Sequence, residues 1–136
     1  MNKIKKAIQR CKSHRKKILE ISQKVPALHI GGSFSCVEIL DCIFFIHKKK
    51  KDNFILSKGH AGIILYVILN SKKILNKKDL DNYSTSSGKL GVHPNYGIPG
   101  ISASTGSLGH GLAISAGISM ARNKKNFNIY VVVSDG

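Results

Sequence analysis

The segment Thr105-Gly106-Ser107-Leu108-Gly109-His110-Gly111, followed directly by the apolar run from Leu112 to Ala121, is the most informative stretch of this chain. Its glycines allow the backbone to approach a ligand without obstruction by side chains. The apolar run predicts a helix, and the free amides at the start of a helix favour a negatively charged or electron-rich group. The segment therefore predicts a loop that leads into a helix and cradles a cofactor.

Three other glycine-rich turns each contain a histidine. They are Leu28-His29-Ile30-Gly31-Gly32, Leu56-Ser57-Lys58-Gly59-His60 and Gly91-Val92-His93-Pro94. An imidazole titrates near neutral pH, so it suits hydrogen bonding to a ligand and proton transfer. Any one of these histidines alone would more often be a structural or surface residue, but their shared setting indicates a common site.

The last residues form the run Val131-Val132-Val133-Ser134-Asp135-Gly136. Its β-branched residues predict a buried strand that ends just before Asp135. Open α/β sheets bind their ligands at the carboxyl ends of parallel strands, and Mg²⁺ prefers hard oxygen donors. Asp135 is therefore a candidate metal ligand, and the alternative is a plain Asp-Gly turn.

Taken in order, these motifs resemble the amino-terminal, thiamine-diphosphate-binding part of transketolase. The resemblance runs from about His29 to Gly136 and is closest to family members that are split into two subunits. It implies an α/β fold in which helices flank a parallel sheet. Since the family's diphosphate-binding domain is considerably longer, it also implies that residues 1–136 are about the first half of one domain, truncated at the metal motif. Leu28 and Ser134 replace glycines of the family pattern.

The resemblance also implies roles for individual residues. It places His60 at the cofactor diphosphate and the active centre, and it places His29 and His93 in the substrate channel, where they help to move protons. It makes Asp135 a ligand of Mg²⁺. The implied cofactor-binding residues are His60, Gly106, Leu108, Asp135 and Gly136. For Leu108, which would pack on the aminopyrimidine ring, the alternative is an ordinary core position at the start of a helix.

The implied reaction is transfer of a two-carbon ketol unit from a ketose phosphate to an aldose phosphate, with thiamine diphosphate and Mg²⁺. The family's cofactor-activating glutamate belongs to a different section. The resemblance therefore implies that the partner is a carboxy-terminal section or subunit, and that the complete protein is a dimer or heterotetramer. One alternative is an enzyme like 1-deoxy-D-xylulose-5-phosphate synthase, although the motif at 56–60 and the motif at 104–111 speak against it. Another is an inactive remnant or a basic nucleic-acid-binding protein.

The composition is strongly basic, with 22 Lys and Arg against 7 Asp and Glu and a formal charge of +15. Such a charge would ordinarily suggest nucleic acid or an anionic membrane as partner. Nearly all the basic residues are Lys, however, and aromatic residues do not alternate with them as on a base-stacking surface. We therefore expect a solvated basic surface that helps to attract sugar phosphates.

The cysteines and the apolar segments bear on localisation. The 3 cysteines are odd in number and show no Cys-x-x-Cys spacing, which fits a reducing cytoplasm. No segment reaches the roughly 18 uninterrupted apolar residues of a membrane span. The sequence thus predicts a cytoplasmic protein without a membrane anchor.

Apolar periodicity predicts an amphipathic helix over about residues 3–25 and a buried helix over 37–47, which Ser35 and Glu38 would cap reciprocally. A turn is predicted at Gly31-Gly32. The other predicted elements are a strand at 54–56, helices at 60–70 and 77–83, a loop at 84–99, a helix at 108–122 and a strand at 128–133. Of the remaining histidines, His14 and His47 are predicted at the surface or at a helix end, and His110 is predicted to shape its loop or an interface.

Overall fold

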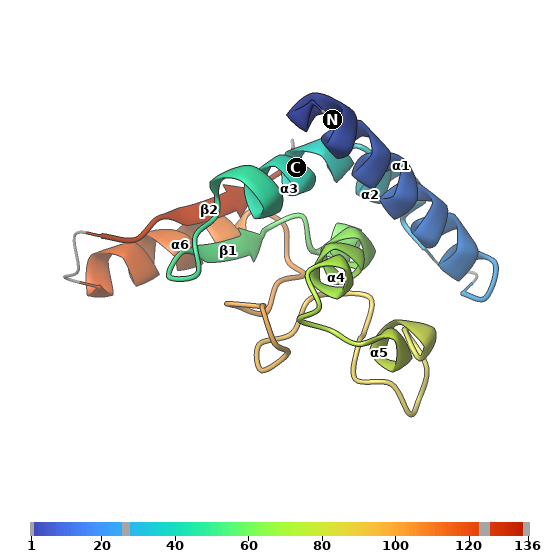
Figure 1. The fold of residues 1–136 in the computed structure, drawn as a ribbon. Helices are drawn as coiled ribbons and strands as arrows, with labels where there is room; N and C mark the ends of the chain where they lie inside the picture. Colours follow the sequence, from blue (N-terminus) through green and yellow to red (C-terminus); the bar gives the residue numbers. More distant parts are fainter. Residues whose placement is uncertain (1, 26–27, 123–125, 135–136) are drawn as a thin grey trace.

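The computed structural model describes residues 2–25, 28–122 and 126–134, and Figure 1 shows their arrangement. In chain order the elements are α1 (Lys3–Ser22), α2 (Ile30–Phe34), α3 (Val37–Cys42), the π-helical turn η1 (Ile43–His47), β1 (Asn53–Leu56), the 3₁₀ turn η2 (Gly59–Ala61), α4 (Gly62–Ser71), α5 (Lys77–Asp81), α6 (His110–Ala121) and β2 (Ile129–Val132). No helix in these ranges is both long enough and apolar enough to cross a membrane.

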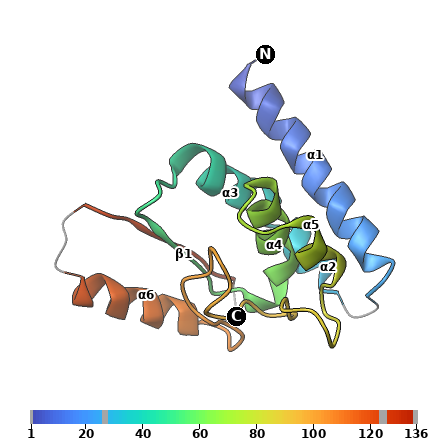
Figure 2. The same cartoon turned by 60° about the horizontal axis from the view of Figure 1, so that its bottom comes forward.

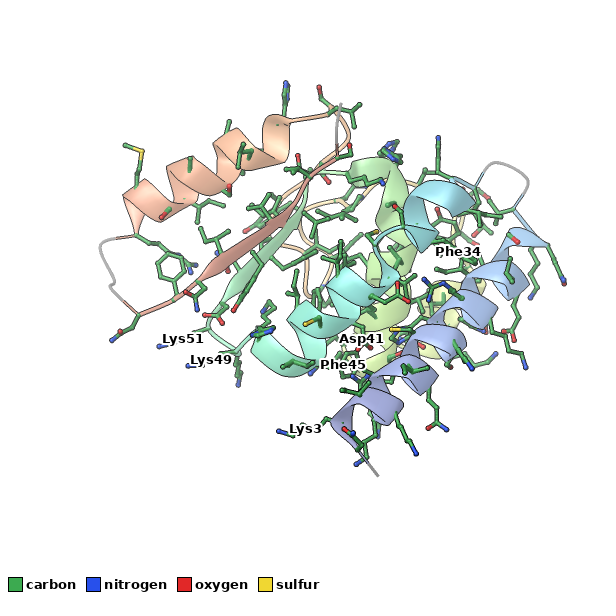
Figure 3. All side chains as sticks on the ribbon, turned by 90° about the horizontal axis from the view of Figure 1, so that it is seen from above. Lys3, Phe34, Asp41, Phe45, Lys49 and Lys51 are labelled. Atoms are coloured by element: carbon green, nitrogen blue, oxygen red, sulfur yellow. The ribbon has the colours of Figure 1, made fainter. Side chains whose placement is uncertain are left out.

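The two strands form a parallel sheet, as predicted. Asn53 pairs with Ile129 at one end of the ladder, and Leu56 pairs with Val132 at the other. Seen from above in Figure 3, α6 lies on one side of the strands, and α3 and α1 lie on the other. Parallel strands need a crossover connection, and here the crossover contains α4, α5 and α6. The predicted α/β fold with helices on both sides of a parallel sheet is confirmed.

Helix α4 forms the centre of the hydrophobic core, and Figure 2 shows it between α1 and α6. Every residue from Gly62 to Leu69 is buried, which the uncharged sequence of this stretch permits on all faces of the helix. Tyr66 on this helix packs against Tyr83, with 5.9 Å between the ring centroids. Its hydroxyl donates a hydrogen bond of 2.9 Å to the carbonyl of His93, so the core holds the backbone of that motif.

Helix α1 is held on the domain by apolar contacts and by two arginine–carboxylate pairs. Arg10 donates two hydrogen bonds of 2.8 Å to Asp41, which lies between α3 and α1 (Figure 3). Arg15 forms a second two-point contact with Glu38. Because Asp41 is only 1% exposed, its charge requires this partner. The basic face of α1 therefore has a structural role besides contact with solvent, because two of its arginines hold the helix against α3.

The predicted capping box at the start of α3 is wrong. Helix α3 begins after Cys36 without a side-chain cap. The carboxylate of Glu38 accepts a hydrogen bond from Arg15 instead, and the hydroxyl of Ser35 donates to the carbonyl of Gly32 at 2.9 Å. The predicted turn at Gly31-Gly32 is also wrong, because both glycines belong to the short helix α2.

The other elements lie close to their predicted bounds. The helix predicted over 37–47 has the expected extent, but it continues as a π-helical turn and leaves Ile39 and Ile46 half exposed or more. The helix predicted over 3–25 ends at Ser22. The helix predicted from residue 108 starts at His110, since Gly109 adopts a left-handed conformation with φ +78°.

His14 was predicted at the surface or at a helix end, but it is buried in the middle of α1. Only 3% of the residue is exposed, and its Nε2 lies 3.1 Å from the hydroxyl of Ser71. Its Nδ1 has no hydrogen-bond partner among the described residues and lies 3.9 Å from a carboxylate oxygen of Asp41. Burial lowers the pKa of His14; Asp41 opposes this effect, and Arg10 adds to it. His47, in contrast, is exposed at the end of η1, as predicted.

Acid should destabilise the fold through His14. The unfolded chain takes up a proton at this residue below about pH 6.5, whereas the lowered pKa keeps the folded chain neutral until a lower pH. Between these two pKa values the unfolded state binds more protons, so the free energy of unfolding falls by at most about 1.4 kcal/mol per pH unit. Urea unfolding at pH 7.5 and 5.5 measures this loss.

The variant His14→Gln should lose less stability than the wild type between the same two pH values. Glutamine can still hydrogen-bond to Ser71 but cannot take up a proton. The matched variant His47→Gln, at an exposed histidine, should retain the wild-type pH dependence. An equal loss of stability in the wild type and in His14→Gln would contradict this account of the buried imidazole.

Candidate functional site

The candidate site begins at the carboxyl end of β1, where the chain leaves the sheet beside the end of β2. The amide of Ser57 donates to the carbonyl of Val132 at 2.8 Å, and the amide of Lys58 reaches the same oxygen at 3.3 Å. This pairing continues the parallel ladder beyond Leu56 and fixes the direction of the loop. The segment that follows, Gly59–Ala61, turns directly into the buried helix α4.

The ring of His29, the residue before α2, lies close to the ring of His60. Their ring centroids are 5.4 Å apart, with an angle of 54° between the ring planes. A Cβ atom at Gly32 would lie 3.0 Å from Cδ2 and 3.1 Å from Nε2 of His60. The glycine therefore leaves the space that the imidazole occupies, and the first two histidine motifs form one cluster.

The third histidine motif and the loop before α6 meet this cluster through Gly59 and Gly106. A Cβ at Gly59 would come within 2.9 Å of the Gly106 amide nitrogen and of the Thr105 carbonyl oxygen. A Cβ at Gly106 would in turn lie 3.6 Å from the ring of His93. The amide of Thr105 also donates to the carbonyl of Pro94 at 3.0 Å. The three histidine motifs and the segment that begins at Thr105 are thus neighbours in space.

The start of α6 packs directly on the loop after β1. The amide of Gly111 donates to the hydroxyl of Ser57 at 3.1 Å, and a Cβ at Gly111 would lie only 2.6 Å from that of Ser57. The sequence predicted that the amides here would be free for a ligand. For Gly111 this prediction is wrong, because a side chain 54 residues earlier takes its hydrogen bond.

The loop residues between Thr105 and α6 are open to solvent. Gly106 is exposed, and Leu108 is 47% exposed, so the described chain does not bury it as a core residue. Thr105 is 8% exposed, and its hydroxyl has no partner among the described residues. His110 lies 3.4 Å from the hydroxyl of Ser107, in agreement with its predicted part in shaping the loop.

Among the described residues, the side chains whose charge acts on His60 are all basic. Partial burial lowers the pKa of His60, and His29, Lys58 and His93 lower it further. At neutral pH the imidazole is therefore neutral, with one nitrogen able to donate a hydrogen bond and the other able to accept one. This is the form that can exchange a proton with a bound ligand.

The predicted metal ligand cannot be placed. Asp135 and the predicted cofactor contact Gly136 lie outside the described residues. Within residues 2–25, 28–122 and 126–134, no group of three or more histidine, cysteine or acidic side chains could hold a metal ion. The role of Asp135 therefore stays a prediction from the sequence.

The sequence of this chain matches the model of a known protein family. The model of the transketolase thiamine diphosphate binding domain matches residues 41–132, which is more than half of the chain. The chain belongs to the transketolase family. The match covers the motifs of His60, His93 and Gly106, whereas His29 precedes it.

Related proteins of this family include two that are named as subunits. An apulose-4-phosphate transketolase subunit from Phocaeicola vulgatus is 36% identical over 134 residues, covering 90% of this chain and 48% of the relative. A 6-deoxy-6-sulfo-D-fructose transketolase subunit from a Clostridium species is 32% identical over 134 residues, covering 90% of this chain and 49% of the relative. The chain thus spans about half the length of these relatives.

The fold agrees with a solved structure of the same family. Transketolase from Leishmania mexicana superposes on all of this chain with a TM-score of 0.84 at 22% identity, and the chain covers 23% of that protein. At this level of identity the similarity shows the fold alone. It supports the α/β assignment of this transketolase-family chain, including its short parallel sheet.

Two site residues of this family member were missed by sequence reasoning. The buried hydroxyl of Thr105 was not singled out, although it directly precedes Gly106. Lys58 was quoted within its motif without a role, yet its charge acts on His60. The sequence offered one indication of a role for Lys58. It lies between the end of a predicted strand and a predicted active-centre histidine, so its backbone must lie at the carboxyl end of the sheet.

A pair of glycine substitutions on α6 tests the packing that positions this site. Gly111→Ala should destabilise the fold by about 1 to 3 kcal/mol, because the new methyl group overlaps Ser57. Gly117→Ala on the same helix meets nothing within 4 Å and should stabilise the fold by up to about 1 kcal/mol. Denaturant unfolding of both variants measures the difference. Equal effects at the two positions would show that α6 does not pack on Ser57.

Proposed function

We propose that this chain supplies the diphosphate-binding part of a transketolase active site. The reaction is the transfer of a two-carbon ketol unit from a ketose phosphate to an aldose phosphate, using thiamine diphosphate and Mg²⁺. The observation that carries this proposal is a set of neighbouring contacts at one end of the parallel sheet: His29 lies beside His60, Gly59 packs on Gly106, and Gly106 lies beside the ring of His93. Open α/β sheets bind ligands at this end.

The described residues fit the cofactor in three respects. Gly106 presents an exposed backbone beside His93, which allows close approach of a flat ring, and Leu108 offers an apolar surface on which a ring can pack. The hydroxyl of Thr105, which has no hydrogen-bond partner within the described part of the chain, lies directly before this backbone and can serve a polar ligand atom. When bound, thiamine diphosphate supplies the nucleophilic carbon that carries the transferred unit.

The three histidines have different roles in this proposal: one binds the cofactor, and two act on the sugar substrate. His60 hydrogen-bonds the diphosphate, and its lowered pKa keeps it neutral, so it does so without a permanent charge. His29 and His93 are exposed and extend the cluster outward, where they hydrogen-bond the sugar hydroxyls and hold or release protons. In this proposal Asp135 would provide an oxygen ligand for Mg²⁺, and Gly136 would bind beside the diphosphate.

A carboxy-terminal section or subunit completes the site in this proposal. The two relatives of similar coverage, from Phocaeicola vulgatus and from Clostridium, both carry the word subunit in their names. Helix α6, which follows the cofactor loop, leaves large apolar side chains open, with Leu112 59% and Met120 84% exposed. Apolar surface of this kind marks interaction sites. We place the assembled enzyme, a dimer or heterotetramer, in the cytoplasm.

The histidines should not respond alike when substituted in the assembled enzyme, prepared by co-expression with its carboxy-terminal section. His29→Ala and His93→Ala should lower kcat/KM for sugar phosphates by about 10²-fold, the usual loss for an acid-base or oriented hydrogen-bonding group. His60→Ala should in addition weaken the binding of thiamine diphosphate by about tenfold. Steady-state ketol transfer and calorimetry of cofactor binding measure these effects.

His47→Ala is the matched control, because His47 is exposed and lies outside the cluster. Its kcat/KM should stay within about twofold of the wild type, as expected for a surface group. Similar small losses at all four histidines would remove the site proposed here. Formation of deoxyxylulose phosphate from pyruvate, without ketol transfer, would instead favour the related synthase.

A further inference from the structure

Lys58 is the one residue of the Leu-Ser-Lys-Gly-His motif whose chemistry the proposed function leaves unused. Its backbone is fixed at the end of the sheet by the hydrogen bond to Val132. Its side chain crosses to α2, where Nζ donates to the hydroxyl of Ser35 at 2.9 Å. The same hydroxyl donates to the carbonyl of Gly32, so the position of the ammonium group is defined by two successive hydrogen bonds.

This geometry brings Lys58 next to the histidine cluster. A Cβ at Gly32 would lie 3.5 Å from Cε of Lys58 and 3.0 Å from the ring of His60. The two side chains therefore flank the same glycine. The charge of Lys58 reaches the imidazole, since it contributes to the lowered pKa of His60.

The positive charge of Lys58, beside the histidine cluster, is not balanced by the described acidic residues. Each of the six is engaged elsewhere in the fold. They are Glu20 with Lys17, Glu38 with Arg15, Asp41 with Arg10, Asp52 with the amides of Lys49 and Asn128, Asp79 with Lys89, and Asp81 with Lys77. Lys58 is held by a neutral hydroxyl instead. An ammonium group with two remaining donors beside imidazoles is suited to a phosphate oxygen.

We propose that Lys58, positioned by Ser35, is a phosphate-binding residue of this site. The proposal rests on the proposed function, which brings two phosphate sources to the site: the cofactor diphosphate and the phosphorylated sugar. Ser35 acts as a positioning residue, because its hydroxyl orients the ammonium group and its own contacts are to the chain. Lys58 and His60 lie near the same point beside Gly32, so both could contact one ligand there.

The test uses the full chain with millimolar inorganic pyrophosphate and, separately, ribose 5-phosphate, followed through the imidazole proton resonances of His60. Lys58→Met should weaken binding of at least one ligand by about tenfold, the usual loss for a charge-assisted hydrogen bond. Lys58→Arg should retain most of the affinity. Loss for pyrophosphate alone assigns Lys58 to the cofactor, and loss for ribose 5-phosphate alone assigns it to the sugar.

Lys51→Met is the charge-matched control. Lys51 is exposed in the turn before β1 and points away from the fold (Figure 3). Equal weakening in Lys51→Met and Lys58→Met, or no response of His60 to either ligand in the wild type, would overturn the proposal. Without ligand, the pKa of His60 should rise in Lys58→Met, and far-UV circular dichroism should match the wild type; an unchanged pKa in a folded variant would also overturn it.

The result separates this inference from the proposed function. Phosphate binding through Lys58, with no ketol transfer by the assembled enzyme, would leave the lysine assignment intact and reject the transketolase activity. Ketol transfer together with unchanged phosphate affinity in Lys58→Met would support the activity and reject the role of the lysine.

Discussion

Close backbone contact beyond the end of β1 is the constraint on which the rest of the site depends. A Cβ at Gly59 would meet the backbone of residues 105 and 106, and a Cβ at Gly62 would lie 2.5 Å from the carbonyl oxygen of Val92. Backbone atoms cannot move aside as a flexible side chain can, so even a methyl group would separate these loops. The glycines of the motifs are thus required by the packing of the chain against itself, before any ligand is considered.

The second requirement is a rigid base for exposed side chains. Helix α4 is buried along Gly62–Leu69, and its Tyr66 holds the backbone of His93. The imidazoles of His29 and His93 remain exposed above this base. A site that exchanges ligands needs accessible groups, whereas orientation needs a support that does not move. A helix that is buried over most of its length, together with the exposed loops that carry the histidines, meets both needs.

The sequence predicted those features that depend on local patterns. Apolar runs located both strands and α4, and the four motifs predicted that His29, His60 and Gly106 would be neighbours. It failed where distant residues compete. Glu38 pairs with Arg15, 23 residues away, in place of capping α3, and Gly111 is satisfied by Ser57 in place of a ligand. The prediction for His14 was wrong because its neighbours in the sequence are basic, which suggested an exposed position. In the helix it lies between Cys11 and Ile18 on the buried face of α1.

The distribution of acidic residues links stability to function. The buried Asp41 and its neighbour Glu38 dock α1, and Asp52 accepts hydrogen bonds from the amides of Lys49, in the turn before β1, and Asn128, directly before β2. Negative charge is thus used within the described chain to assemble the fold, and no described carboxylate is among the groups that shift the pKa of His60. Since salt screens charges beyond about 8 Å under physiological conditions, the lysines of α1 act only weakly on a ligand at the end of the sheet. The local field there comes from Lys58 and the imidazoles. It follows that the high net charge of the chain says little about its ligand. The absence of a described carboxylate close to Lys58 and these imidazoles, in contrast, favours an anionic ligand group.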